Sequence, residues 1–483
     1  MVFCYPLFVD REDIMANSIA SDRSKAVLPW ILGVTIFMQM LETTILNTAL
    51  PTMAKDLGES PLQMQSTIIS YALTLAICTP LSGIVSDKFG TKYTFIISLF
   101  VFTLGSLFCA LSMNLTQLNL ARVLQGVGGA LSIPVARLSI FKTYPKSDIL
   151  RIMNYAITPA LIGPMLGPIL GGYLVQYLSW HWVFLINLPI GLICLSLAIF
   201  FMPDYKADNV KMDYVGYVLF AASISLLILG LQFISRQNNE VFSMMLLCLG
   251  LLLLVSYWIY AYYSTSPLYS VELFKIRTFV VGIFGGILAR LGIASIPFVV
   301  PLLLQVGMGY TPELSGWMLV PLALANLINK PMVTTIMRWY GYKTVLIINT
   351  LLISILIMVM GFVAPHVHAA VLIGLLFALG FCNSIQFSAM NTLTIADLTD
   401  ENVSSGNSLM LVVQQASLTL AIAFAAIFMN IFAHVPMAYF DHKTEPFQAT
   451  MIIMGLFTLF STLVFVILKG TDGDNMANRT FKR

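Results

Sequence analysis

Apolar stretches of about 20 residues alternate with short polar connections along almost the whole 483-residue chain. A helix rises 1.5 Å per residue, so roughly 20 apolar residues span the ~30 Å hydrocarbon core of a bilayer. The pattern predicts an all-α polytopic membrane protein with fourteen transmembrane helices. These are expected at residues 27–50, 62–86, 93–113, 117–139, 153–176, 181–202, 215–235, 241–263, 279–303, 314–337, 344–364, 369–391, 408–432 and 449–468.

Lys and Arg residues are distributed unevenly between the two sets of connections. Nineteen of the 25 lie in the terminal segments, in the connections that follow even-numbered spans, or at the span ends that border them. The opposite loops hold only Lys55, Arg236 and Lys443. Because positive charges favour the cytoplasmic side of a membrane, an even number of spans places both termini in the cytoplasm.

A short charged turn occurs twice, after the second span and after the tenth. The first copy, Asp-Lys-Phe-Gly-Thr-Lys at 87–92, shares its Gly and its last Lys with Arg-Trp-Tyr-Gly-Tyr-Lys at 338–343. The repeat predicts two parallel six-helix halves with a binding site between them near mid-membrane. The expected parts are a cytoplasmic tail (1–26), a first half (27–202), a two-helix insert (215–263), a second half (279–468) and a second cytoplasmic tail (469–483).

The composition disfavours several classes of protein. With 58% hydrophobic and 10% charged residues and a mean hydropathy of +0.88, the chain lies outside the range of soluble domains. A net charge of +3 without a long basic stretch indicates no nucleic-acid partner. The six cysteines form no Cys-x-x-Cys pair, so we expect neither a disulfide framework nor a metal site. We also expect no cleaved signal peptide, and translation from Met15, because residues 1–14 show no membrane pattern.

The turn after the second span carries a candidate conformational latch. We expect Gly83 to let two helices approach closely and Gly90 to permit the chain reversal. Asp87 can lie against the positive N-terminus of a neighbouring helix, while Lys88 and Lys92 hold the loop on the cytoplasmic side.

Two ionisable residues lie deep within apolar spans. Glu42 precedes Pro51 by nine residues in the first span, and Arg122 lies in a glycine-containing part of the fourth. A charge at such depth is costly unless it faces a cavity or a partner, so both are candidates for function. Arg122 could hold the Glu42 carboxylate deprotonated until a proton or substrate competes, or the two could neutralise each other for purely structural reasons.

The fifth span combines small residues with proline. Glycines spaced by four leave a smooth helix face for a neighbouring helix, and proline interrupts the hydrogen-bond ladder. Simple kinked packing would use the same residue types. The residues are Gly163, Gly167, Pro168, Gly171 and Gly172.

These motifs stand beside two segments with a familiar pattern, Leu41–Pro51 (LETTILNTALP) and Ser179–Gly191 (SWHWVFLINLPIG). Together they resemble the fourteen-span drug:proton antiporter family of the major facilitator superfamily. Gly58–Pro61 and Met390–Thr394, among other segments, are similar to its MdtD-like branch. The family usually has Asp where Glu42 stands, a difference that keeps the charge on a longer arm.

The resemblance implies a major facilitator fold in the bacterial inner membrane. It implies export of small organic molecules in exchange for protons, driven by the proton gradient without a cofactor, with Glu42 and Arg122 in the coupling path. It also implies that Asp87 latches the cytoplasmic side against the N-terminus of the thirteenth span, near Ser404 to Ser408.

The charge balance within the spans favours an anionic or carboxylate-bearing substrate. Glu42 supplies one negative charge, whereas Arg122, Arg290 and Lys330 supply three positive charges. Arg290 and Lys330 suit a carboxylate better than a lipophilic cation, although both could instead bind helix carbonyls or extend towards the interface. Polar residues that could line the second half of the cavity, or merely hold helices together, are Asn326, Asn329, Asn383, Gln386, Gln414 and Gln415.

Other functions stay open. A facilitator or symporter that brings a metabolite inward would have the same fold. An enzyme is disfavoured because no Ser/His/Asp or Cys/His set has useful spacing, and an ATP-driven pump because no phosphate-binding glycine loop is present. A sensor is disfavoured because it would usually carry a sizeable soluble domain. We expect a monomer whose partners are a small-molecule substrate, protons and the lipid bilayer.

Overall fold

The computed structural model describes residues 22–160, 162–206, 213–235, 240–364, 367–399, 402–434 and 443–477. Within these ranges the chain forms helices and connections without a β-strand, which confirms the expected all-α class. The expectation about Met15 lies outside the described residues. The helices are α2 (Asp22–Leu57), α3 (Gln65–Cys78), α4 (Leu81–Phe89), α5 (Thr91–Ala110), α6 (Leu115–Thr143), α7 (Lys146–Ala160), α8 (Gly163–Tyr177), α9 (His181–Leu185), α10 (Asn187–Phe201), α11 (Tyr214–Ser235), α12 (Glu240–Tyr263), η1 (Val271–Lys275), α13 (Arg277–Leu302), η2 (Leu303–Gly307), α14 (Pro312–Ile328), α15 (Lys330–Tyr340), α16 (Tyr342–Val363), α17 (Ala369–Ile395), α18 (Val403–His434), α19 (Glu445–Val466) and α20 (Asp474–Ala477).

Each expected span falls on one helix or on consecutive helices. In the described ranges, 11 helices are long and apolar enough to cross a membrane, or 13 when each of two bent pairs counts as one span. The bends are 59° between α3 and α4 and 63° between α14 and α15, and Pro80 and Pro331 lie at these breaks. A proline cannot donate to the preceding turn, which explains a kink there. The number fourteen stays a prediction.

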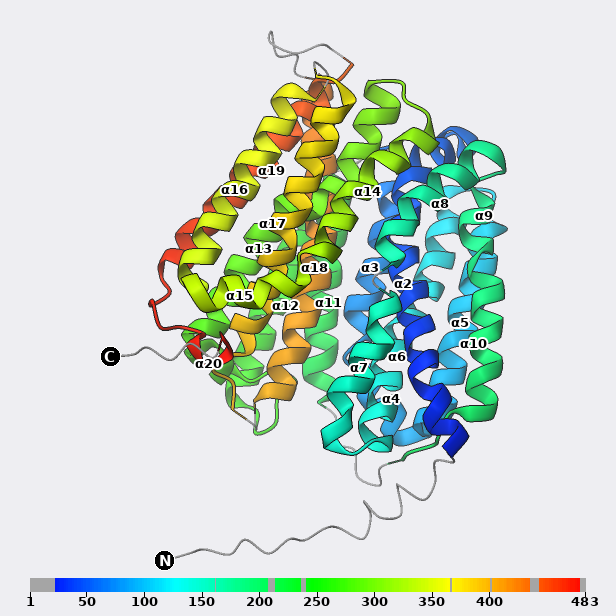
Figure 1. Ribbon diagram of the computed structural model, residues 1–483, viewed down its shortest axis with the longest axis vertical. Coiled ribbons are helices and arrows are strands. Elements are labelled where there is room, and N and C mark those ends of the chain that lie inside the picture. The colour runs from blue at the N-terminus through cyan, green and yellow to red at the C-terminus, as the bar shows by residue number, and fades with distance from the viewer. Residues whose placement is uncertain are drawn as a thin grey trace, which may run out of the picture.

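Two groups of helices lie side by side in Figure 1, α2 to α10 in one and α13 to α19 in the other. They meet where α8 packs on α14 and where α3 packs on α18, with a smaller contact between α2 and α13. The insert forms a hairpin of α11 and α12, and α11 packs on both α18 and α3. The insert therefore covers one of the two main seams between the halves.

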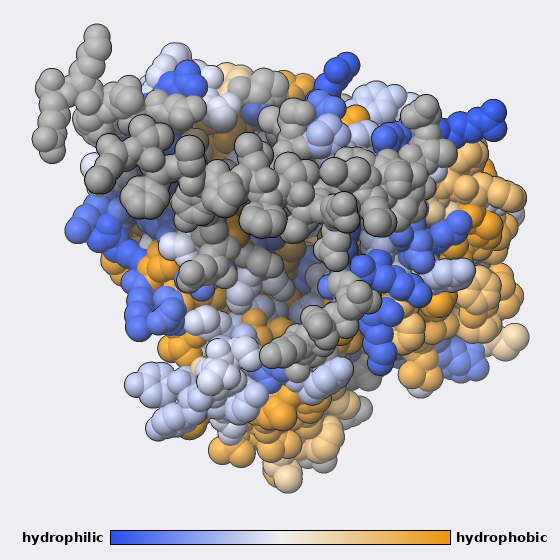
Figure 2. Space-filling model, turned by 90° about the horizontal axis from the view of Figure 1, so that it is seen from below, coloured by the Kyte–Doolittle hydropathy of each residue, from blue (hydrophilic) through white to orange (hydrophobic). Residues whose placement is uncertain are grey.

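Buried apolar side chains hold the two halves together mainly at one end of the molecule. The largest cluster includes Trp180 of the first half and Phe298 of the second, and lies towards the end opposite the start of α2. Towards the start of α2 each half has its own cluster, around Phe95 and around Phe465. The insert bridges them there, through a cluster that includes Ala76 of α3. Figure 2 looks onto this end and shows hydrophilic residues gathered beside apolar areas.

Candidate functional site

Glu42 of α2 and Arg122 of α6 form an ion pair between the Glu42 Oε1 and Arg122 Nη1 atoms. Their side chains are 0% and 1% exposed. The second carboxylate oxygen, Oε2, accepts a hydrogen bond from Nδ2 of Asn187 on α10. The buried carboxylate is tolerated because both of its oxygens are satisfied.

Arg122 has further partners that do not depend on Glu42. Its Nε donates to the Thr67 carbonyl oxygen at 3.1 Å, and its Nη1 donates to Gln125 Oε1 at 2.6 Å. The guanidinium lies over the Tyr71 ring, with Cζ 4.3 Å from the ring centroid. The positive charge therefore stays well accommodated when the carboxylate changes its state.

The sequence did not assign a role to Asn187. It lies within Ser179–Gly191, the segment whose pattern contributed to the family resemblance. The sequence signal for Asn187 was its position as a polar residue at the start of an otherwise apolar helix. In the structure its side chain faces Glu42.

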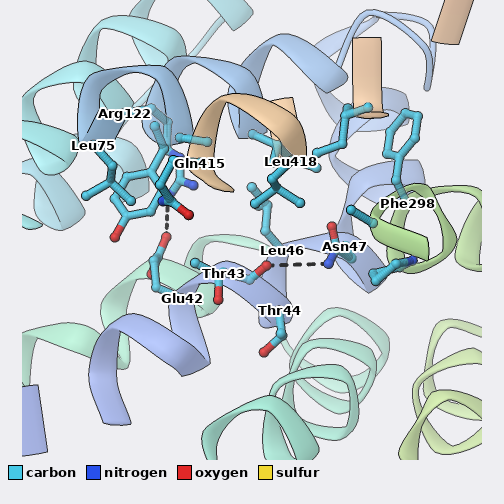
Figure 3. A pocket seen from close by; sticks show the side chains of 16 residues that line it. Glu42, Thr43, Thr44, Leu46, Asn47, Leu75, Arg122, Phe298, Gln415 and Leu418 are labelled. Carbon is cyan, nitrogen blue, oxygen red and sulfur yellow. Dashed lines mark hydrogen bonds and ion pairs between the residues drawn. The ribbon is translucent and has the colours of Figure 1, made fainter. Parts of the chain in front are cut away.

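A cavity of about 170 Å³ adjoins the ion pair between the two halves. Figure 3 shows Glu42 and Arg122 facing each other at one side of this cavity and Phe298 at the other. Its wall comes from α2, α3 and α6 of the first half and from α13 and α18 of the second, including Gln415. We call this space the first cavity.

A second cavity, of about 310 Å³, shares Thr44, Asn47 and Pro297 with the first. Its wall continues along α8, α14 and α17 and includes Pro168 and Lys330. The amide of Asn383 donates to Asn326 Oδ1 at 3.2 Å on the same wall. Thus Lys330, Asn326 and Asn383 lie at a cavity, as the sequence indicated.

Gln386 lines neither cavity, and of the two alternatives left open by the sequence, the structure shows that it holds helices together. Its side chain is 2% exposed and lies between α17 and α16, where Nε2 donates to Thr350 at 2.8 Å and Oε1 accepts from Asn349 at 2.9 Å. Asn329 is also a packing residue, donating to the Phe381 carbonyl oxygen at 2.8 Å. Both residues join helices of the second half.

Arg290 and Gln414 meet at a third polar residue, Asn391, which was not among the candidates predicted from the sequence. Arg290 Nη2 donates to Asn391 Oδ1 at 3.1 Å, and Gln414 Nε2 donates to the same oxygen at 2.8 Å. This network joins α13, α17 and α18 of the second half. Arg290 and Gln414 are absent from the walls of both cavities described above.

The glycines of α8 bring it close to helices of both halves. A Cβ at Gly167 or Gly171 would collide with α2 at Thr44 or Ile45. Gly163 packs on α2 as well, whereas a Cβ at Gly172 would collide with the Pro312 carbonyl oxygen of α14. α8 is therefore packed tightly between α2 and α14, and larger residues at these positions would force the helices apart.

The charged turn agrees with the sequence at Gly90 and differs at Gly83. Gly90 has φ +93° and Gly341 has φ +76°, the left-handed region that favours glycine, so the two copies share the same reversal. A Cβ at Gly83 would meet no atom within 4 Å, and the residue is exposed. The expected close approach at Gly83 is wrong because α4 is bent by 59° from α3.

The carboxylate at a helix N-terminus in this region is Asp204, not Asp87. Asp204 Oδ1 accepts the Lys92 N–H at 3.2 Å at the start of α5, and the Thr91 N–H donates to the Tyr205 carbonyl oxygen at 3.1 Å. We call residues 203–205, which follow α10, the strap. Such a carboxylate stabilises a helix N-terminus.

Asp87 points towards α6 in this conformation. Its Oδ1 lies 4.0 Å from Lys142 Nζ, and both side chains are about a third exposed (31% and 33%). Lys88 is exposed beside the Phe89 ring. A latch between Asp87 and the start of α18 stays a prediction for a different conformation.

Comparison with known proteins identifies the family. The model described as Major Facilitator Superfamily matches residues 32–421 and 282–482. The chain belongs to the major facilitator superfamily.

Relatives within the superfamily place it in the MdtD-like branch. The chain is 41% identical over 457 residues to the "Putative multidrug resistance protein MdtD" of Pectobacterium carotovorum subsp. carotovorum (strain PC1), covering 94% of this chain and 96% of that protein. It is 42% identical over 459 residues to the protein of the same name in Enterobacter sp. (strain 638), covering 94% and 97%.

Solved structures of transporters share the fold. A POT family transporter in complex with 5-aminolevulinic acid has a TM-score of 0.72 at 14% identity, covering 96% of this chain and 99% of that chain. A bacterial homolog of the human lysosomal transporter Spinster has a TM-score of 0.66 at 12% identity, covering 96% and 100%. The major facilitator chain is thus a multi-pass membrane transporter and not an enzyme.

In this major facilitator protein, polar contacts also join the halves at the end opposite the start of α2. Tyr177 OH donates to Glu313 Oε2 at 2.8 Å, from the end of α8 to the start of α14. Gln305 Nε2 of η2 donates to the Thr48 carbonyl oxygen of α2 at 2.9 Å. Together with the large apolar cluster, these bonds close that end of the molecule.

Proposed function

We propose that the chain is a proton-coupled antiporter that exports small organic molecules across the bacterial inner membrane. The name of its MdtD relatives supports a multidrug substrate range. The observation that carries the proposal is Glu42, a fully buried carboxylate on the wall of a cavity shared by both halves. Intramembrane carboxylates that reach such a cavity are suited to take up and release protons.

The surroundings of Arg122 allow Glu42 to be protonated without stranding a buried cation. Protonation weakens the ion pair, but Arg122 keeps the Thr67 carbonyl, Gln125 and the Tyr71 ring as partners. Removing one member of a buried pair otherwise costs about 3–5 kcal/mol. Glu42 can therefore alternate between a charged, paired form and a neutral form as access to the cavity changes.

The second cavity supports an anionic or carboxylate-bearing substrate. Lys330 is exposed on its wall beside Asn326 and Asn383, and no carboxylate is among its described lining residues. A lysine accessible from a cavity attracts a carboxylate, whereas a lipophilic cation would be repelled.

A proton-linked uptake symporter of the same fold is the second candidate, because of the position of Arg122. When Glu42 is protonated, Arg122 keeps its hydrogen bonds but loses its neutralising carboxylate, so the wall of the first cavity gains a net positive charge that strengthens the binding of an anion. An anion and a proton would then move in the same direction. Antiport of an anion requires instead that the two sites be coupled through conformation.

The test uses proteoliposomes with a pH gradient imposed in either direction and a pH-sensitive dye inside. Fluorescein serves as an organic anion and ethidium as a lipophilic cation. Wild type is compared with Glu42→Gln and with Glu272→Gln, a control that removes an exposed carboxylate. We expect fluorescein to move against the proton flux in wild type and in the control. In Glu42→Gln, fluorescein should still exchange down its own gradient, but without moving protons.

Three results would contradict parts of the proposal. Wild-type proton coupling in Glu42→Gln would remove Glu42 from the coupling path. Movement of fluorescein together with protons would support the symporter. Transport of ethidium alone would exclude the anionic substrate class.

A further inference from the structure

The two halves differ in the partner of the arginine that joins their first and fourth helices. In the first half, α2 and α6 are joined by an ion pair of Glu42 and Arg122. In the second half, the corresponding first and fourth helices, α13 and α17, are joined by Arg290 and a neutral amide, Asn391. Within the described part of the chain, no carboxylate lies within ion-pair distance of Arg290. One half is therefore neutral at this place, while the other carries a positive charge.

N–H groups of this network lack acceptors. Arg290 Nε is buried without a hydrogen-bond partner. The single oxygen that Asn391 offers is taken by Arg290 and by Gln414. Among the described residues, neither Arg290 Nη1 nor Asn391 Nδ2 has an acceptor. A buried cation surrounded by donors is unfavourable until an anion joins it.

The network adjoins the first cavity. Ala294, one turn beyond Arg290 on α13, and Gln415, the neighbour of Gln414 on α18, both line that cavity. One helical turn is about 5.4 Å, so the backbone of Arg290 lies about that far along α13 from a residue of the cavity wall. The guanidinium packs against Gly286, one turn towards the start of α13, because a Cβ there would lie only 2.7 Å from Arg290 Nη1. The Arg290 side chain is 9% exposed.

We propose that Arg290, Asn391 and Gln414 form a binding site for a monovalent anion, in particular a carboxylate. The guanidinium offers the planar fork that matches a carboxylate, and the Asn391 amide nitrogen adds a further donor. The site deepens the proposed function, on which it rests, by naming where the substrate carboxylate binds. A free halide ion has the same charge and is the other possible source of the anion.

The test measures binding to the purified full chain in detergent, in a halide-free buffer without a proton gradient. Sodium benzoate, the neutral isostere benzamide and sodium chloride are titrated by calorimetry. The key variant is Asn391→Asp, which places a carboxylate beside Arg290. The matched variant is Asn475→Asp, the same exchange at an exposed residue of α20 that lies outside the walls of both cavities. Arg290→Gln is the third variant.

We expect benzoate to bind wild type and benzamide not to bind. Asn391→Asp should weaken benzoate binding at least about tenfold, because the new carboxylate occupies the site, and should raise the thermal midpoint. Asn475→Asp should bind benzoate within about twofold of wild type, which corresponds to about 0.4 kcal/mol. If chloride competes with benzoate for binding, the site is a general anion site. If benzoate binding is unchanged by chloride, the site is specific for a carboxylate.

Two outcomes would overturn the inference. Unchanged benzoate binding in Asn391→Asp would do so, even if Arg290→Gln fails to fold. An equal loss of benzoate binding in Asn475→Asp would do so too, because it would show that an added carboxylate weakens binding without occupying the site. Neither measurement depends on proton coupling, so a failure here is distinguishable from a failure of the antiport proposal.

Discussion

Replacing Gly171 by alanine tests whether α8 packs directly on α2. An added Cβ would collide with the Ile45 carbonyl oxygen and with Thr48 Oγ1. The Ile45 oxygen belongs to the backbone of a helix, so the collision cannot be relieved by turning a side chain. The two helices must therefore move apart.

The expected magnitude follows from two opposing effects. Overpacking of a tight interface costs about 1–3 kcal/mol. Alanine in place of a helical glycine returns about 0.5–1 kcal/mol. We expect Gly171→Ala to lose about 1–2 kcal/mol overall. The matched control is Gly374→Ala on α17, where a Cβ meets no atom within 4 Å, and there the stability should rise by about 0.5–1 kcal/mol.

The assay is the unfolding of each purified variant in mixed detergent micelles with increasing denaturing detergent, followed by tryptophan fluorescence. The two alanine variants should shift the midpoint in opposite directions. Equal shifts for both, or a stabilised Gly171→Ala, would refute the close packing of α8 against α2.

Three further predictions concern contacts at the ends of the helices. Tyr177→Phe removes the bond to Glu313 and should raise the labelling rate of a cysteine placed in the second cavity about two- to fivefold; an unchanged rate would argue against a gating role. Burial opposes the ionisation of Asp472, but the Arg277 guanidinium holds the pKa of Asp472 below its usual value of 3.8. The Arg277–Asp472 ion pair should therefore protect the C-terminal segment from hydrogen exchange above about pH 4. This protection should be lost as the pH falls through the lowered pKa of Asp472, and Asp472→Asn should lack it at every pH. Asp204→Ala should cost about 1 kcal/mol in the same unfolding assay by releasing the strap from α5, and no change would argue against the helix cap.

Hydropathy was sufficient to locate the helices, because a segment in lipid must satisfy its backbone hydrogen bonds internally and present an apolar surface. The pairing of Glu42 with Arg122 was also accessible from the sequence. Two opposite charges deep in apolar spans have few alternatives to each other. Gly90 was recognisable because a reversal between two helices commonly requires a positive φ.

The direction in which a side chain faces was not accessible from the sequence. Spans that are apolar on all sides carry little information about which face meets which neighbour, so the sequence could not decide whether Gln386 lines a cavity or, as the structure shows, bonds Thr350 of α16. The strap was missed for a related reason, since Asp204 and Lys92 are 112 residues apart in the chain. Gly83 was misjudged because the bend at Pro80 changes what the following turn contacts.

The different charges of the two halves separate two tasks. A group that carries a proton must change its charge within the accessible pH range, and a guanidinium does not. Among the central residues on the described helices, Glu42 meets this requirement, whereas Arg290 can only attract an anion. The first half is thereby suited to the proton and the second half to the substrate. Glu42→Gln and Asn391→Asp should therefore impair different steps. The first should lose proton coupling while it retains benzoate binding, and the second should weaken benzoate binding while the anion that is still transported remains coupled to protons.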